Sequence, residues 1–399
     1  MKVTHFQVCN LPHPEQPSYT IGNNYTTDIP RDYTTSHIRI PHYTSHALNS
    51  IHFPSLHKLH LDFPLSKKRH AVTGDARSDY IEDVHTSAFP TLATHLAYAT
   101  NLTSLHLNIN RLLQYEKGGF LESTYEVFGE NLCWCTKLEE LCIVNSGMVR
   151  GENTPMYSVG LANALVSTLK RRRDTLRVFY KVSGRPLLRD RFANDISSRT
   201  NCRVFSAFVQ SANLEKLHIT CSLGPYCDFV TACNAENDNG KKKPASIRDL
   251  TIECHQIYDV EEENLIIPPV GPMLNYFSEC HSLQRLFLNM PKSCWGEPQT
   301  LDALTNLLTG KPELLRVSLY FSGYDDREGN LVKCLSDVLP QLVVNSTNMT
   351  DILLLNFFFV DEILCNKFTS CMEKLGFVLS RVGGGAAIRF YRPEKKQPL

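Results

Sequence analysis

Aliphatic residues recur along the chain in a six-residue pattern, with apolar side chains at its first, fourth and sixth positions. Residues 283–288, which read LQRLFL, show the pattern in full. Good copies begin at Leu56, Leu102, Leu138, Leu214, Ile247, Leu283, Leu314 and Met349. Looser copies begin at Val3, Leu176 and Gly385. From Leu56 to Met349, successive copies lie about 37 residues apart, so the chain contains an internal repeat.

The fourth and sixth positions alternate with polar residues, which is typical of a short strand with one buried face. Helical spacing of apolar residues precedes several copies, for example in residues 161–169, 273–277 and 360–375. Each repeat is therefore predicted to contain a helix, a short turn and a strand.

The C-terminal segment is expected to close the array. A helix is predicted near residues 360–380, ended by the glycines at 383–385, since glycine adopts positive φ at helix ends. Residues 386–391 are then predicted as the last strand. The charges and proline at 393–396 are expected to protect its exposed edge.

A single repeat is too small to fold alone. Its buried aliphatic side chains stabilise by roughly 1.5–3 kcal/mol each. Ordering its backbone costs about 1–2 kcal/mol per residue. Stacked neighbours share one core and pair their strands in parallel, so the repeats are expected to form a solenoid.

The repeats resemble the leucine-rich repeat superfamily, in the long form with a helix in each unit. The chain is similar from about residue 50 onward to ribonuclease-inhibitor-like horseshoes and to the repeat domains of F-box proteins. The resemblance implies an α/β leucine-rich repeat solenoid of about ten units, with parallel strands on the concave face and helices on the convex face. It also implies protein recognition, or the substrate-recognition part of an F-box-like ubiquitin-ligase adaptor. No F-box is visible in the sequence.

One elongated domain is predicted, with an irregular first segment. Residues 1–55 are irregular, with strands expected at 3–8 and 36–40, and form either an N-terminal cap or the remnant of an upstream unit. Residues 56–399 form the solenoid and its C-terminal cap.

The composition argues against a dedicated nucleic-acid or membrane-surface binder, because 41 basic residues balance 41 acidic ones. The start of the chain shows no secretion signal, and no apolar run reaches the length of a membrane span. The 14 cysteines are therefore interpreted as reduced thiols. A cytoplasmic or nuclear monomer is expected.

The fifth and seventh positions of each copy are predicted to face a protein ligand on the concave side. The candidate partner-binding residues are His60, His106, Tyr180, His218, Phe287, Tyr320, Arg389 and Tyr391. His60 and His106 are expected to be neighbours, because adjacent strands lie about 4.8 Å apart. A pH-sensitive interface is a more plausible role for this pair than a metal site, which needs more ligands.

No motif for a nucleophile, a metalloprotease, a phosphate loop or a dinucleotide occurs, so a non-enzymatic protein without metal or cofactor is predicted. The cysteines at 133 and 135 and at 221, 227 and 233 do not have a standard zinc spacing. Insertions are predicted at 67–87, 181–201 and 222–246. The alternative function is a nuclear or RNA-associated scaffold that uses the basic residues 170–173 and 241–243.

Overall fold

In the computed structural model the chain forms two compact units. They are Met1–Leu176 (the N-terminal unit) and Arg177–Leu399 (the C-terminal unit). The described residues are 5–7, 36–40, 48–49, 52–61, 89–108, 120–145, 159–172, 174–183, 203–204, 207, 213–223, 246–256, 270–295, 297–322, 330–355, 362–382 and 387–393. Most of the predicted insertions, and the basic residues 241–243, lie outside them.

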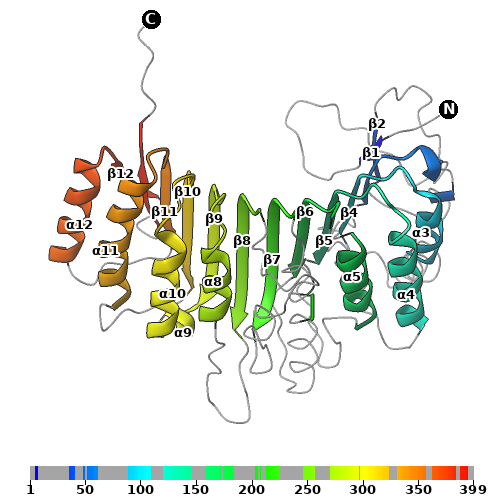
Figure 1. The fold of residues 1–399 in the computed structure, drawn as a ribbon, viewed down its shortest axis with the longest axis horizontal. Helices are drawn as coiled ribbons and strands as arrows, with labels where there is room; N and C mark the ends of the chain where they lie inside the picture. Colours follow the sequence, from blue (N-terminus) through cyan, green and yellow to red (C-terminus); the bar gives the residue numbers. More distant parts are fainter. Residues whose placement is uncertain are drawn as a thin grey trace, which may run out of the picture. The chain divides into compact units, whose positions relative to one another are not determined.

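The N-terminal unit contains a parallel sheet with helices packed along it (Figure 1). Its elements are β1 (His5–Gln7), β2 (Ser36–Ile40), η1 (Phe53–Ser55), β3 (Lys58–Leu61), α3 (Phe89–His95), η3 (Leu96–Tyr98), β4 (Ser104–Asn108), α4 (Phe120–Leu132), β5 (Glu140–Asn145) and α5 (Val159–Arg171). The strand order is β1-β2-β3-β4-β5. The strands predicted at 3–8 and 36–40 are therefore confirmed, and both pair with β3.

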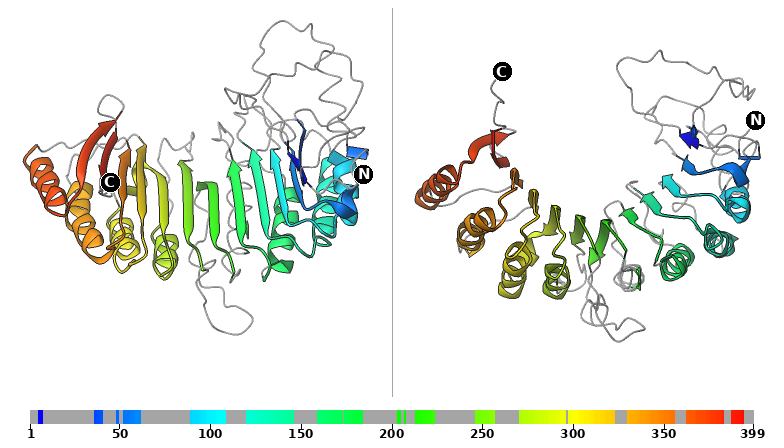
Figure 2. Two further views of the ribbon diagram at one scale, coloured as in Figure 1. Left: turned by 90° about the horizontal axis from the view of Figure 1, so that it is seen from above. Right: turned by 45° about the horizontal axis from the view of Figure 1, so that its top comes forward.

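The C-terminal unit continues the same alternation of strand and helix. Its elements are β6 (Val178–Ser183), β7 (Lys216–Leu223), β8 (Asp249–Gln256), α8 (Gly271–Ser278), β9 (Arg285–Pro291), α9 (Lys292–Trp295), α10 (Pro298–Leu308), β10 (Arg316–Ser322), α11 (Asn330–Asn345), β11 (Asp351–Leu355), α12 (Glu362–Lys374), β12 (Val378–Val382) and β13 (Ala387–Tyr391). Strands β6 to β11 are parallel and in register. Helices α8, α10, α11 and α12 lie on one face of this sheet (Figure 2).

The apolar positions of the six-residue pattern form the core of each unit. In the good copies the first, fourth and sixth side chains are no more than 7% exposed. The second position has a regular role as well. Its carbonyl accepts two backbone N–H groups from the next repeat, as when Arg248 O binds the N–H groups of Gln284 and Arg285. The repeat is thus a unit of packing and of hydrogen bonding.

The C-terminal end differs from the prediction. The helix α12 ends at Lys374, and Gly376, with φ of +83°, takes the place expected for the glycines at 383–385. Residues 378–382 form β12 instead of continuing the helix. The last strand in sequence, β13, lies between β11 and β12 and is antiparallel to both. The predicted tenth parallel copy is therefore wrong, and β12 rather than β13 is the outermost strand.

No described helix combines the length and the apolar character that crossing a bilayer requires.

Candidate functional site

The strands of the C-terminal unit present a second face, opposite the helices, which we call the strand face. The third, fifth and seventh positions of the pattern point to it, since side chains alternate along a strand, whereas the first position is buried in the core. The fifth positions form one row across adjacent strands. That row is Tyr180, His218, Thr251, Phe287, Ser318, Leu353 and Arg389. The structure therefore places the predicted fifth-position residues of this unit in one row across the sheet. Their role in binding a ligand stays a prediction.

The middle of the strand face carries four large apolar or aromatic side chains around Ser318. Phe287 on β9, Tyr320 on β10, and Leu353 and Leu355 on β11 are all partly exposed. Phe287 and Leu353 flank Ser318 in the fifth row, and Tyr320 is level with Leu355 in the seventh. Side chains at direct or diagonal positions on adjacent strands lie within reach of one another, so Tyr320 on the middle strand links Phe287 to Leu353 and Leu355. We call these four residues the Phe287 patch.

An ion pair borders the patch on the β8 side. The guanidinium of Arg285 on β9 donates two hydrogen bonds to the carboxylate of Asp249 on β8, in the third row of the strand face. His218 and Glu253 lie further along the sheet, with 2.9 Å between Nε2 and Oε1. Charged groups on this side therefore engage one another within the protein.

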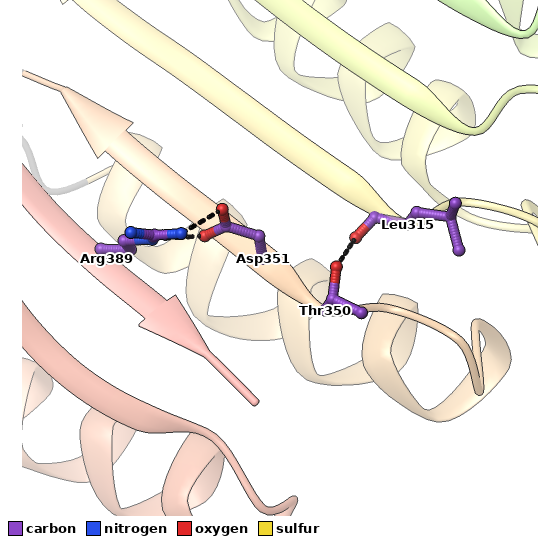
Figure 3. Close-up of polar contacts among 4 residues, drawn as sticks. All are labelled: Leu315, Thr350, Asp351 and Arg389. Atoms are coloured by element: carbon purple, nitrogen blue, oxygen red, sulfur yellow. Dashed lines mark hydrogen bonds and ion pairs between the residues drawn. The ribbon is translucent and has the colours of Figure 1, made fainter. Parts of the chain in front are cut away.

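A second bidentate pair borders the patch on the β13 side. Arg389 Nε and Nη2 lie 2.9 and 2.8 Å from the two carboxylate oxygens of Asp351 (Figure 3). These hydrogen bonds, with the charge of Asp351, raise the pKa of the Arg389 guanidinium. The guanidinium also lies 5.6 Å from the ring centre of Tyr391. The neighbouring Thr350 Oγ1 donates to Leu315 O at 3.1 Å, which anchors the start of β11 to the preceding repeat (Figure 3).

Tyr391 occupies a different row from the one predicted. Because β13 is antiparallel, Tyr391 is level with Asp351 in the third row, and Ala387 is level with Leu355 in the seventh. The prediction assumed a parallel last strand. Tyr391 still lies on the strand face, beside Arg389.

The remaining candidates lie in the N-terminal unit or lack a described side chain. His60 and His106 are level on β3 and β4, and their rings stack with 3.8 Å between centroids. Cys142 follows them on β5, and burial raises the pKa of its thiol to about 12. For Tyr180 the structure describes the backbone, which pairs with His218. Among the described residues, no group of three or more His, Cys, Asp or Glu side chains could hold a metal ion.

The prediction for the fifth and seventh positions covers Leu353 and Leu355, but the candidate residues did not include them, and Asp249 and Asp351 at third positions were left out altogether. Leu353 and Leu355 carried a usable signal, since residues 352–355 are apolar without alternation. A strand that is apolar on both faces indicates that both faces are covered. The carboxylates of Asp249 and Asp351 gave no such signal, because their partners are about 36 to 38 residues away.

Comparison with known proteins finds only distant similarity, and it lies among the solved structures. No protein-family model matches the chain. No curated protein matches it. Among solved structures, a chain from the crystal structure of the Rad7 and Elc1 complex in yeast is similar at 12% identity, with a TM-score of 0.24. The match covers 66% of this chain and 71% of that chain. The α/β architecture with a mainly parallel sheet therefore rests on the strand register and burial described above.

Proposed function

We propose that the strand face of the C-terminal unit binds a protein ligand and that the chain acts as a non-enzymatic recognition module. The observation that carries this proposal is the Phe287 patch, an apolar surface on a face of the sheet that the described helices leave uncovered. Contiguous apolar surface in contact with water marks an interaction site more often than a random surface.

The arrangement of charges supports the same proposal. An apolar centre with a polar rim is the usual anatomy of a protein interface. The pairs Asp249–Arg285 and Asp351–Arg389 hold their guanidinium groups in fixed positions at that rim. A ligand that covers Phe287 and Tyr320 would then meet oriented side chains and would order few of them on binding.

We also propose that the repeats belong to the leucine-rich repeat class and that the strand face is its concave surface. The repeat length, the buried pattern positions and the shared carbonyl at each second position support this assignment. A role as the substrate-recognition part of a ubiquitin-ligase adaptor is the more specific form of the proposal and follows from the resemblance in sequence.

Affinity purification tests the proposal. The intact chain and a variant with Phe287→Ala and Leu353→Ala would serve as parallel baits, followed by quantitative mass spectrometry. Val344→Ala is the matched control, because Val344 is a hydrophobic residue 62% exposed on α11, away from the strand face. We expect a partner that the control retains and the double variant loses.

The partner would then be purified and its affinity measured against single variants. A central hydrophobic anchor is worth about 2 kcal/mol or more, so Phe287→Ala should raise the Kd at least about tenfold. Equal recovery with all three baits would reject the strand face as the site. If no other ubiquitin-ligase subunit appears in any purification, the role in a ubiquitin ligase is rejected. The role in protein recognition would still stand.

A further inference from the structure

Two aromatic side chains project into solvent from the N-terminal unit. Tyr98 is 61% exposed and Trp134 is 63% exposed. Each stands four residues before the first leucine of its repeat, Leu102 and Leu138 respectively. They therefore occupy the same structural position in consecutive repeats. Because the position repeats, the two exposed rings form a regular surface feature of the N-terminal unit.

Hydrogen bonds between the repeats fix both aromatic positions. Asn131 Nδ2 donates to Ala93 O at 2.8 Å, joining the end of α4 to α3. Cys135 Sγ, next to Trp134, lies 3.6 Å from Leu96 O, two residues before Tyr98. The backbone around Trp134 is held in a turn, with its N–H 3.0 Å from Asn131 O. The two rings are thus carried on a rigid support, which lowers the entropic cost of binding.

A cationic side chain from the next repeat holds the turn that carries Trp134. Arg172, at the end of α5, donates from Nη2 to Cys133 O at 2.6 Å and from Nη1 to Thr136 O at 3.4 Å. The guanidinium therefore bridges the carbonyl groups on the two sides of Trp134. Lys170 and Arg171, in the last turn of the same helix, are exposed.

The charges at this edge are of both signs and lie close together. Burial raises the pKa of the Cys133 thiol, and the charges of Arg171 and Arg172 act in the opposite direction. Glu130, one turn before Trp134, raises the same pKa. The charges placed around Cys133 at this edge are therefore those of Arg171, Arg172 and Glu130, beside the exposed ring of Trp134.

These features discriminate between classes of ligand. A nucleic acid carries a charge on every phosphate, so it would place some of them beside Glu130. A peptide can place carboxylates at Lys170 and Arg171 and apolar side chains at the rings and beside Glu130. Carboxylates bind guanidinium groups through strong, paired hydrogen bonds, and Trp, Tyr and Arg are the residues most enriched at the centres of protein interfaces.

We propose that the Trp134 edge, which comprises Tyr98, Trp134, Lys170, Arg171 and Arg172, binds an acidic peptide segment of a partner protein, with aliphatic side chains between its carboxylates. The proposal is independent of the strand face, because it rests on another surface in another unit. Its partner contacts the turns between helix and strand, and the aliphatic side chains cover the two rings.

Intrinsic fluorescence offers a direct test, because the chain of 399 residues has two tryptophans and Trp295 is fully buried. Quenching by iodide should therefore report on Trp134, and Trp134→Phe should abolish the quenchable signal. The probe is a synthetic peptide in which leucine pairs alternate with glutamates. A second peptide carries glutamine in place of every glutamate. We expect the acidic peptide to protect Trp134 from iodide saturably and the glutamine peptide to bind at least about tenfold more weakly, a difference of about 1.4 kcal/mol.

Variants then locate the site with the labelled acidic peptide and fluorescence anisotropy. Tyr98→Ala and Arg171→Glu should each raise the Kd about tenfold or more. Val127→Ala is the matched control, since Val127 is 40% exposed on α4 of the same unit, and it should leave the Kd unchanged. All these side chains are exposed, so circular dichroism should show the same unfolding temperature for each variant.

Three results would overturn the proposal. One is equal binding of the two peptides, or no saturable binding of either. Another is an effect of Tyr98→Ala no larger than that of Val127→Ala. The third is stronger protection of Trp134 by oligothymidylate than by the acidic peptide, which would assign the edge to single-stranded nucleic acid instead.

Discussion

The ammonium group of Lys311 lies 2.9 Å from the carbonyl oxygen of Cys280, in a part of the C-terminal unit where Lys311 is 0% exposed. The same Nζ donates to the carbonyl groups of Phe277 and Ser278 at the end of α8. A helix ends with carbonyl groups that have no partner within the helix. Lys311, from the next repeat, donates to these groups, and Phe277 O also accepts the backbone N–H of Cys280. Arg172 has the corresponding role at the end of α4 in the N-terminal unit.

Replacement of Lys311 by methionine should therefore destabilise the protein strongly. Methionine keeps the apolar stem but removes the donor to the carbonyl groups of Ser278 and Cys280, whereas Phe277 O keeps the backbone N–H of Cys280. We expect the free energy of unfolding to fall by about 2–4 kcal/mol, measured by urea denaturation, because each unpaired buried polar group costs about 1–3 kcal/mol. Lys333→Met, at an exposed position on α11, should change it by less than about 0.5 kcal/mol. Equal stability of the two variants would show that Lys311 does not support the end of α8.

Close packing of two helices predicts an effect at Gly129. A Cβ at this position of α4 would lie 2.6 Å from both Cα and Cβ of Ala164 on α5. Gly129→Ala gains about 1 kcal/mol of helix propensity, but the overlap should cost about 1–3 kcal/mol, so we expect a net loss of stability. Gly271→Ala is the matched control, since its nearest atom would be 3.4 Å away. Thermal unfolding should place Gly129→Ala below the wild type and Gly271→Ala level with it or above. A melting temperature at or above that of the wild type for Gly129→Ala would contradict the close approach of α4 and α5.

Buried thiols should make the protein less stable at alkaline pH. Burial raises the pKa of the Cys135 thiol from 9.0 to about 12. Between these values the folded protein retains a proton that the unfolded chain has lost, so the free energy of unfolding falls as the pH rises. The slope from this thiol is at most about 1.4 kcal/mol per pH unit. Cys135→Ala should show a shallower fall between pH 8 and 10.5 in urea denaturation than the wild type. Parallel curves for the two proteins would contradict the prediction.

The sequence was sufficient for features that repeat and insufficient for features that depend on single contacts. Leu286 and Leu288 could be assigned to the core because alternation sets their direction, and the row from His218 to Leu353 followed from equal positions in each parallel copy. Alternation reads the same in both directions along a strand, however, so it could not show that β13 is antiparallel.

Burial of polar groups was equally hidden. Lysine is almost never fully buried unless it is paired, so nothing local indicated that Lys311 lies inside the C-terminal unit. Its three carbonyl partners are more than thirty residues away and have no side-chain signature. The two exposed rings of the Trp134 edge had a weak signal in their common offset from Leu102 and Leu138, but the exposure itself needed the structure.

At the end of α12, a single glycine with positive φ separates the helix from strand β12. Gly376 has a φ of +83°, and its N–H donates to Glu373 O at 2.9 Å. The N–H of Phe377 donates to Met372 O at 3.1 Å, and both of these side chains are buried. This pair of hydrogen bonds is the Schellman motif, which needs a left-handed residue at the position of Gly376.

An L-residue in that conformation costs about 1–2 kcal/mol, and asparagine tolerates it better than alanine. Gly376→Ala should therefore lower the free energy of unfolding by about 1 kcal/mol or more and Gly376→Asn by less. Hydrogen exchange should be faster in β12 and β13, since β12 begins two residues later and pairs only with β13 among the described strands. Faster exchange in Gly376→Ala than in Gly376→Asn, with β8 and β9 unchanged, would locate the effect at the turn. Unchanged exchange in β12 with alanine would mean that the turn does not hold the last two strands in place.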